Sequence, residues 1–152
     1  MSNDTFDVEG FIAGVQAEVP TDTFTPHPAG DFVGSIRDKS VEIKKVPFSN
    51  GDTGARFTAY WVTSAEQPAI RDEFLLDIVR WDDGSNMPVL ATGQNKNVRL
   101  GKRLAALGLA RPGWSFAQMN GAGPARIKVE HEPDKKDPEI VYARVAQVSA
   151  AR

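Results

Sequence analysis

The side chains most often used in catalysis and metal binding are sparse in this chain. It contains no cysteine and only two histidines, His27 and His131, which lie far apart in the sequence. Without cysteine, thiolate nucleophiles, thiolate metal ligands and disulfides are excluded, and neither histidine has a serine or aspartate at a spacing that would position it. We therefore predict no catalytic residue, no metal site and no cofactor.

Two other patterns resemble catalytic motifs only superficially. The Gly121–Gly123 segment lacks the third glycine and the Lys-Ser or Lys-Thr step that phosphate-binding loops require, so we interpret it as a loop. The carboxylate pairs Asp72-Glu73 and Asp82-Asp83 fall at the two ends of a predicted strand. Solubility and turn formation explain these pairs better than acid-base catalysis, and the chain is predicted not to be an enzyme.

Basic and aromatic residues occur close together at several points, a combination that suits single-stranded nucleic acid. Cations follow the phosphates, and each base that stacks on an exposed ring contributes roughly 1 to 3 kcal/mol. Rings in strands often belong to the core instead, and lysines at strand edges often serve only solubility. The candidate nucleic-acid contacts are Lys44, Lys45, Phe48, Arg56, Tyr60, Arg80, Trp81, Lys135 and Lys136.

Charge is unevenly distributed along the chain, although the net charge is only -2. Residues 1–31 contain six acidic residues and no basic one, whereas residues 84–129 contain seven basic residues and no acidic one. This polarity suggests a polyanionic partner for the body of the protein and an acidic arm that competes with it. A solvated helix face is the alternative interpretation. The helical part of the basic stretch predicts a secondary basic surface of Lys96, Arg99 and Arg103.

Strand patterns begin at Gly30. Apolar residues alternate through Ile36 and resume at Val41 after an Asp-Lys-Ser step, which predicts a long, bent first strand. Residues 47–54 are dense in turn formers, with Asn50-Gly51 as a hairpin signal, and a second strand follows to about Thr63. Its Phe57 and Trp61 are expected in the core, on the face opposite Arg56 and Tyr60.

A third strand is predicted over residues 72–81, with Phe74, Leu76 and Ile78 in the core and Trp81 partly exposed. Residues 95–107 then change to helical spacing, with Gly108 as the C-terminal cap. A short helical turn is expected around residues 114–119. Strands over residues 125–131 and 139–149, separated by a polar loop, complete the chain.

The order of three strands, one helix and two strands is the order of the OB-fold, a partly open five-stranded barrel. We therefore predict a mostly β fold: a five-stranded OB-fold barrel with one α-helix between strands 3 and 4, over residues 30–150. Residues 1–29 are predicted to be an acidic, flexible N-terminal arm. Within it, residues 6–15 suit a docking peptide, an extra strand or helix packed on the barrel, or an ordered terminus without function.

Membrane insertion and export are not expected. No apolar run approaches the roughly 18 residues of a membrane span, and the opening MSNDTFDVEG lacks the basic and apolar regions of an export signal. The absence of cysteine also fits a reducing compartment. We predict a soluble protein of the cytoplasm.

The chain resembles the small single-stranded DNA-binding proteins encoded by tailed bacteriophages. The similar features are the PAGDF segment of residues 28–32, the RLAALG helix end of residues 103–108, Met119-Asn120-Gly121 before the strand RIKV, and the charged turn of residues 132–139. The resemblance covers residues 28–149. Many single-strand binders carry an acidic C-terminal tail that recruits partners, whereas this chain ends Ala150-Ala151-Arg152 and its acidic segment is N-terminal.

The resemblance implies an OB-fold that coats exposed single strands during replication or recombination, largely without sequence preference. Single-stranded DNA is the predicted partner, with RNA, a homodimer and contacts to replication or recombination proteins left open. The expected location is the cytoplasm of an infected or host bacterial cell. The main alternative is a protein-interaction or structural module, for example of a virus particle, that uses the barrel as a scaffold; inhibition of a host nuclease through the basic helix is a weaker one.

Overall fold

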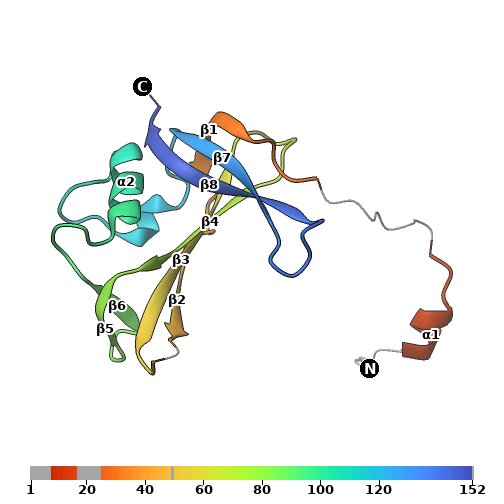
Figure 1. Cartoon of the computed structure of the whole chain (residues 1–152), viewed down its shortest axis with the longest axis horizontal. Helices are drawn as coiled ribbons and strands as arrows, with labels where there is room; N and C mark the ends of the chain where they lie inside the picture. The colour runs from red at the N-terminus through yellow and green to blue at the C-terminus, as the bar shows by residue number, and fades with distance from the viewer. Residues whose placement is uncertain (1–7, 17–24, 49, 152) are drawn as a thin grey trace, which may run out of the picture.

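The computed structural model describes residues 8–16, 25–48 and 50–151. Strands dominate these residues, so the prediction of a mostly β protein is confirmed (Figure 1). The strands are β1 (Gly30–Ile36), β2 (Glu42–Pro47), β3 (Thr53–Val62), β4 (Ile70–Leu76), β5 (Ile78–Asp82), β6 (Met87–Leu90), β7 (Ala125–Pro133) and β8 (Val141–Ala150). The helices are α1 (Val8–Ala13), α2 (Val98–Ala106) and a 3-10 turn at Phe116–Met119.

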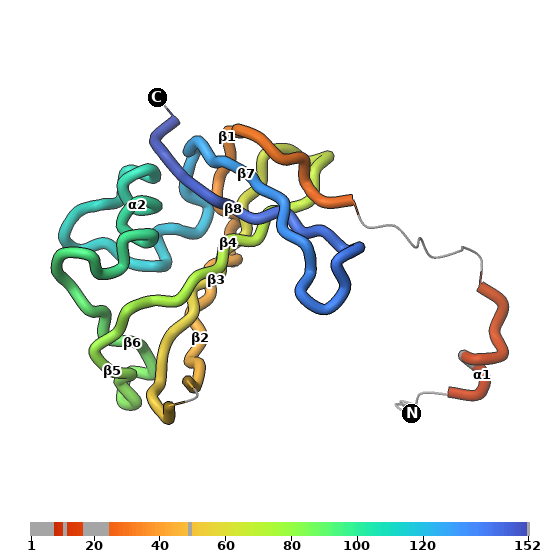
Figure 2. Tube along the Cα trace, in the orientation of Figure 1, coloured from red at the N-terminus to blue at the C-terminus, as the bar shows by residue number. Residues whose placement is uncertain are grey.

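Five strands form a closed ring in the order β1–β7–β8–β4–β3, with β3 pairing back onto β1. The β4–β8 pair is parallel, at Arg71 and Arg144, and the other pairs of the ring are antiparallel. Figure 2 shows the result in space: β1, near the start of the body, lies beside β7, almost a hundred residues later in the chain. The ring therefore depends on pairings between distant segments.

The predicted long first strand is present as β1 and β2, which both pair with β3. The break falls at the predicted Asp38-Lys39-Ser40 step, where Lys39 has φ of 61°. The Ser40 hydroxyl lies 2.6 Å from the Arg37 carbonyl and accepts the Tyr60 N–H at 3.2 Å, so it replaces the ladder hydrogen bonds that the bend interrupts. Because of the bend, β1 pairs with β7 and with the end of β3, and β2 pairs with the rest of β3.

The core lies inside the ring and beneath α2. Alternate residues of β3 point inward, and Phe57 and Trp61 are fully buried, as predicted. Phe57 stacks on Phe74 of β4 with ring centroids 4.8 Å apart. Burying a side chain of this size stabilises the fold by roughly 1.5 to 3 kcal/mol. The predicted core residues Phe74 and Leu76 are buried as well, whereas Ile78 is half-buried against the cluster.

Arg103 was expected on a basic surface, and that prediction is wrong. Its side chain is only 4% exposed, and its guanidinium lies 4.8 Å from the centre of the Phe74 ring. The Nε and Nη2 atoms donate to the two oxygens of Asp72 at 2.7 and 2.9 Å. Helical spacing alone groups Arg103 with Arg99, but residue 103 faces β4 next to Leu100 and Leu104 of the buried side of α2.

Asp72 was interpreted as part of a solvated carboxylate pair, and this is also wrong. It is 2% exposed and, besides Arg103, accepts the indole N–H of Trp61 at 3.0 Å. Glu73, the next residue, is exposed on the opposite face of β4. A carboxylate with charged and neutral donors on both oxygens can be buried at a tolerable cost. The pair therefore joins α2 to the ring.

The predicted third strand of residues 72–81 is interrupted at Asp77. β4 ends at Leu76, and β5 leaves the ring to form a separate hairpin with β6, which the sequence reading missed. Asn97 fixes this break: its Oδ1 accepts the Asp77 N–H at 2.7 Å, and its Nδ2 donates to the carbonyls of Asp77 and Ala91. The base of the β5–β6 hairpin is thereby held beside the start of α2.

α2 is shorter than the predicted 95–107 because Asn97 adopts a left-handed conformation, with φ of 53°, and its side chain is used by the hairpin. At the other end Gly108 has φ of 74°, and the N–H groups of residues 108 and 109 donate to the carbonyls of residues 105 and 104. That is the glycine cap predicted for this helix. The expected turn near residues 114–119 is present as Phe116–Met119, capped by Ser115.

Pro26 and His27 are packed on the ring, although they were assigned to the flexible arm. His27 is 1% exposed; its Nδ1–H donates to the Pro28 carbonyl at 2.8 Å, and its Nε2 lies 2.6 Å from the Thr63 hydroxyl. His131 Nε2 donates to the His27 carbonyl at 2.7 Å. The packed body thus begins before Gly30. Residues 1–7 and 17–24 lie outside the described residues, so the flexibility of the arm stays a prediction.

Candidate nucleic-acid interface

The outer face of β2, β3 and β4 carries the polar side chains that alternate with the core residues. Arg56, Thr58 and Tyr60 are half-buried on this face, between the buried Ala55, Phe57, Ala59 and Trp61. Residues directly opposite one another on paired strands point to the same face. The registers therefore give three rows across the face: Lys44–Arg56–Leu75, Glu42–Thr58–Glu73 and Tyr60–Arg71–Arg144.

These rows alternate in charge. The first and third contain two cations each, and the middle row contains Glu42 and Glu73. Glu73 accepts a hydrogen bond from the Thr58 hydroxyl at 3.3 Å and lies 4.0 Å from the Arg71 guanidinium. Arg56 and Tyr60 share one face, as the sequence predicted, but an acidic row separates the two basic ones.

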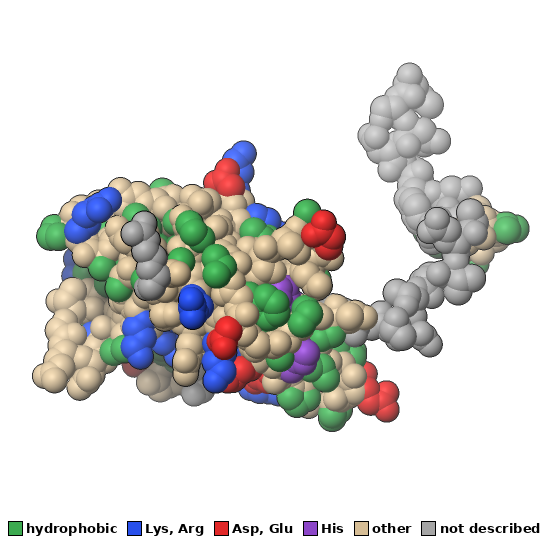
Figure 3. Space-filling model, turned by 90° about the horizontal axis from the view of Figure 1, so that it is seen from above, with side chains coloured by type: hydrophobic (Ala, Val, Ile, Leu, Met, Phe, Trp, Pro, Cys, Tyr) green, Lys and Arg blue, Asp and Glu red, His purple; other side chains and the backbone are tan. Residues whose placement is uncertain are grey.

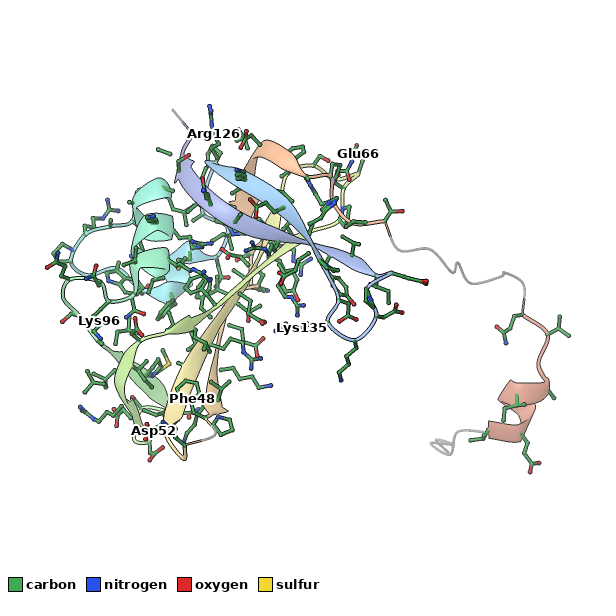
Figure 4. The ribbon with its side chains drawn as sticks, viewed as in Figure 1. Phe48, Asp52, Glu66, Lys96, Arg126 and Lys135 are labelled. Carbon is green, nitrogen blue, oxygen red and sulfur yellow. The ribbon has the colours of Figure 1, made fainter. Side chains whose placement is uncertain are left out.

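One hollow lies where this face meets the β7–β8 loop, and we call it the loop groove. Figure 4 shows Lys135 at the tip of that loop. The groove has a volume of about 520 Å³. It is lined by Pro26, His27, Tyr60, Pro68, Ala69, Arg71, Glu73, Glu132, Pro133, Asp134, Lys135, Tyr142, Ala143 and Arg144.

Ion pairs and a ring contact order the cations around the loop groove. Arg144 donates to Glu130 at 3.1 Å and lies 3.3 Å from Glu132. The guanidinium of Arg37 lies 5.0 Å from the centre of the Tyr60 ring. These contacts hold the arginines beside the groove in place. An incoming phosphate would have to compete with the carboxylates of Glu73, Glu130 and Glu132 for Arg71 and Arg144.

A second hollow lies between the β2–β3 turn and the β5–β6 hairpin, and we call it the turn groove. Its volume is about 640 Å³. It is lined by Lys45, Phe48, Asp52, Thr53, Gly54, Leu75, Leu76, Asp77, Ile78, Val79, Arg80, Trp81, Asp83, Ala91 and Lys96. Phe48, Leu75 and Val79 are 40%, 58% and 66% exposed. Exposed apolar side chains therefore gather here among lysines and an arginine.

Phe48 occupies its turn position because it packs on a glycine. Its ring fills the space that a Cβ atom on Gly54 would need. The turn itself closes through the Phe48 N–H, which donates to the Asp52 carbonyl at 2.8 Å, and Gly51 has the φ of 90° that favours glycine. The ring is consequently fixed with one face on the backbone and a substantial part in solvent (Figure 4).

Trp81 is half-buried, in agreement with the expected partial exposure. Its indole N–H donates to Asn86 Oδ1 at 3.2 Å, and the Lys45 ammonium lies 5.8 Å from its ring centre. Lys45 also pairs with Asp83 at 3.4 Å. Because both are exposed, this ion pair is worth little and leaves Lys45 available to a phosphate.

The structure divides the predicted contact residues between the two grooves. Lys45, Phe48, Arg80 and Trp81 line the turn groove together with Lys96, whereas Tyr60 and Lys135 line the loop groove. Lys44 and Arg56 lie opposite each other on the outer face, and Lys136 is exposed in the β7–β8 loop. Their role in binding stays a prediction.

Several residues of these surfaces escaped the sequence reading. Arg71 and Arg144 are adjacent only because β4 and β8 pair in parallel across 73 residues, for which no local signal exists. Leu75 could have been found, since it alternates with the buried Phe74 and Leu76. The β6 strand also had a signal, because Asp83-Gly84 lies between two stretches of strand-forming residues.

The basic stretch of residues 84–129 does not form one surface. Lys96 lines the turn groove, Arg99 and Lys102 lie on α2, Arg103 is buried, and Arg126 and Lys128 are exposed on β7. Figure 3 shows the upper face of the molecule, where basic, acidic and hydrophobic side chains are interspersed. The stretch is continuous in sequence only.

One carboxylate of the β5–β6 turn is shifted in its acidity. The hydroxyl of Ser85 donates to Asp82 at 2.7 Å and the Gly84 N–H at 3.2 Å, and these hydrogen bonds lower the pKa of Asp82 below 3.8. These hydrogen bonds show that Asp82 stabilises the β5–β6 turn, as expected for the Asp82-Asp83 pair. Within the described part of the chain, no group of three or more histidine, aspartate and glutamate side chains is arranged to hold a metal ion.

A scan of the sequence against protein-family models found no match, and a search of curated protein sequences found none either. None of the helices among residues 8–16, 25–48 and 50–151 is long and apolar enough to cross a membrane.

Proposed function

We propose that this protein is an OB-fold that binds single-stranded DNA without enzymatic activity and coats exposed strands. The supporting observation is the order of the ring. With β1 and β2 counted as one bent strand, the chain order of the ring strands is β1/β2, β3, β4, β7 and β8, and α2 lies between β4 and β7. OB-folds bind oligonucleotides on their second and third strands and the adjoining loops.

The proposed binding surface follows from that topology. The outer face of β3 and β4 is the face of the second and third strands, and it lies between the β2–β3 turn with Phe48 and the β7–β8 loop with Lys135 (Figure 4). Arginines and lysines of the first and third rows contact phosphates, while Phe48 and Tyr60 provide surfaces on which bases stack. Stacking on any base face is indifferent to sequence, which suits a coating protein.

An oligonucleotide titration tests this proposal. Oligo-dT is added while intrinsic fluorescence is followed at several salt concentrations, with Trp81 in the turn groove as the reporter. If the four cations of the first and third rows each contact a phosphate, the log-log slope of affinity against salt should be about -3. Failure of oligo-dT to bind, or binding that is independent of salt, would exclude the proposal.

A second candidate function is a protein-interaction module. The observation that favours it is the exposed apolar set of the turn groove, Phe48, Leu75 and Val79, together with Met87, which is 45% exposed on β6. Solvent-exposed apolar clusters commonly mark protein contacts. This candidate expects a stable complex with another protein that is lost on L75S/V79S substitution, and no salt-dependent binding of oligonucleotides.

A further inference from the structure

A third hollow differs in charge from the two grooves described above. This helix groove lies between α2 and the end of β8 and is lined by Arg99, Lys102, Arg103, Ala105, Ala106, Ala146, Gln147, Val148, Ser149 and Ala150. Among the residues that the structure describes, its lining contains no acidic residue, whereas the linings of the loop groove and the turn groove each contain three. It is therefore the most favourable of the three for an acidic ligand.

Two of its cations are uncompensated. Arg103 is neutralised by Asp72, but Arg99 and Lys102 are exposed and form no ion pair with any residue that the structure describes. The rest of the described lining consists mostly of small side chains: four alanines, Val148 and Ser149, together with Gln147. No aromatic ring is found among the described lining residues, so these offer bases nothing to stack on. Its chemistry suits an acidic segment with aliphatic side chains.

The N-terminal segment of this chain has that chemistry. Residues 1–24 contain five acidic residues and no basic one. Val8 and Ile12 lie four residues apart on α1, and Val15 follows two residues after the helix ends; these side chains are 54%, 76% and 98% exposed. The segment thus carries apolar side chains that the described structure leaves in solvent.

The segment is also long enough to reach the helix groove. Pro26 and His27 line the loop groove beside Ala143 of β8, and the helix groove includes Val148 of the same strand. Five residues of a strand span about 17 Å. The ten residues 17–26 can extend to roughly 33 to 36 Å. A tethered ligand within reach has a high effective concentration, which favours binding in the same molecule.

We propose that residues 1–16 dock in the helix groove of their own chain. Val8 and Ile12 lie against the alanine-lined surface, and the acidic side chains lie beside Arg99 and Lys102. This inference does not depend on the proposed nucleic-acid function. Docking gives the acidic arm a defined binding site in the helix groove. Arg99 and Lys102 then become accessible to other polyanions only when the arm is displaced.

Paramagnetic NMR on the full chain tests the proposal, because the protein has no cysteine and a single one can be introduced for labelling. A nitroxide on Gln16→Cys should weaken the amide signals of residues 98–106 and 146–150. The R99E/K102E variant should restore those signals, and so should V8S/I12S, which leaves the charge unchanged. K39E/R111E is the matched control: it reverses two exposed charges elsewhere and should leave the weakening intact.

Mixing experiments distinguish docking within one molecule from docking onto a second copy of the chain. When isotope-labelled protein without nitroxide is mixed with unlabelled protein that carries it, the proposal expects no weakening. Weakening only in this mixture would overturn docking within one chain. Unchanged signals around the helix groove in the singly labelled protein, or equal weakening in R99E/K102E and the parent, would overturn the proposal altogether. Unperturbed signals of the Trp61 core in each variant confirm that it is folded.

Discussion

Replacement of Arg103 by methionine should destabilise the fold strongly, because it leaves a buried carboxylate without its charged partner. Asp72 is 2% exposed and would retain only the Trp61 indole N–H as a donor. Breaking a buried pair by removing one partner costs about 3 to 5 kcal/mol. For a domain of this size each kcal/mol lowers the melting temperature by roughly 2 to 4 °C. We expect R103M to melt about 6 to 20 °C lower than the parent.

A double-mutant cycle separates the ion pair from the packing. Asp72→Asn keeps an acceptor for Trp61 and removes the charge, so D72N/R103M contains no unpaired buried ion. Replacing a whole buried pair by neutral groups is often nearly neutral. The double variant should therefore be more stable than R103M, with a coupling energy of about 2 kcal/mol or more between the two sites. If the stability losses of D72N and R103M, measured by urea or thermal unfolding, simply add in the double variant, Arg103 is not the charge partner of Asp72.

Other predictions concern the binding face and one turn. Glu42→Gln removes a negative charge from the middle row of the outer face. The affinity for oligo-dT, measured by fluorescence, should therefore rise about twofold. Weaker binding would contradict the proposed location of the DNA on this face. Phe48→Ala should lower that affinity by about 10-fold or more through lost stacking, whereas Val98→Ala on α2, an apolar site of comparable exposure, should leave it unchanged. The depressed pKa of Asp82 means that its turn is stabilised above pH 3.8 and loses that contribution as the pH falls through the folded-state value. Carboxyl NMR of Asp82 checks this, and a midpoint at or above 3.8 would contradict it.

The strands of the ring were predictable because burial alternates along them. β3 shows this best: Phe57 and Trp61 alternate with Arg56 and Tyr60, and the structure places the two pairs on opposite faces. The bend of the first strand was also predictable, since the Asp-Lys-Ser step interrupts the alternation. Local sequence encodes these features because each depends on neighbouring residues of one segment.

The errors arose where distant residues decide the outcome. Arg103 has the same helical periodicity as exposed residues, and only Asp72, 31 positions away, explains its burial. The third strand looked continuous because the break at Asp77 is enforced by Asn97, 20 positions further on. His27 looked like part of an arm, yet Thr63 and His131 hold it to the ring. The division of the candidate contacts between two grooves follows from the same long-range pairings.

One measurement tests the proposed function most directly: the affinity of the full chain for oligo-dT as a function of salt concentration. The proposed function predicts saturable binding with a log-log slope of about -3, reflecting phosphate contacts by the first and third rows of the outer face. It also predicts that the charge reversal R56E weakens binding and flattens the slope. Absence of binding at low salt, or an R56E variant that binds with the parent's affinity and slope, would contradict it.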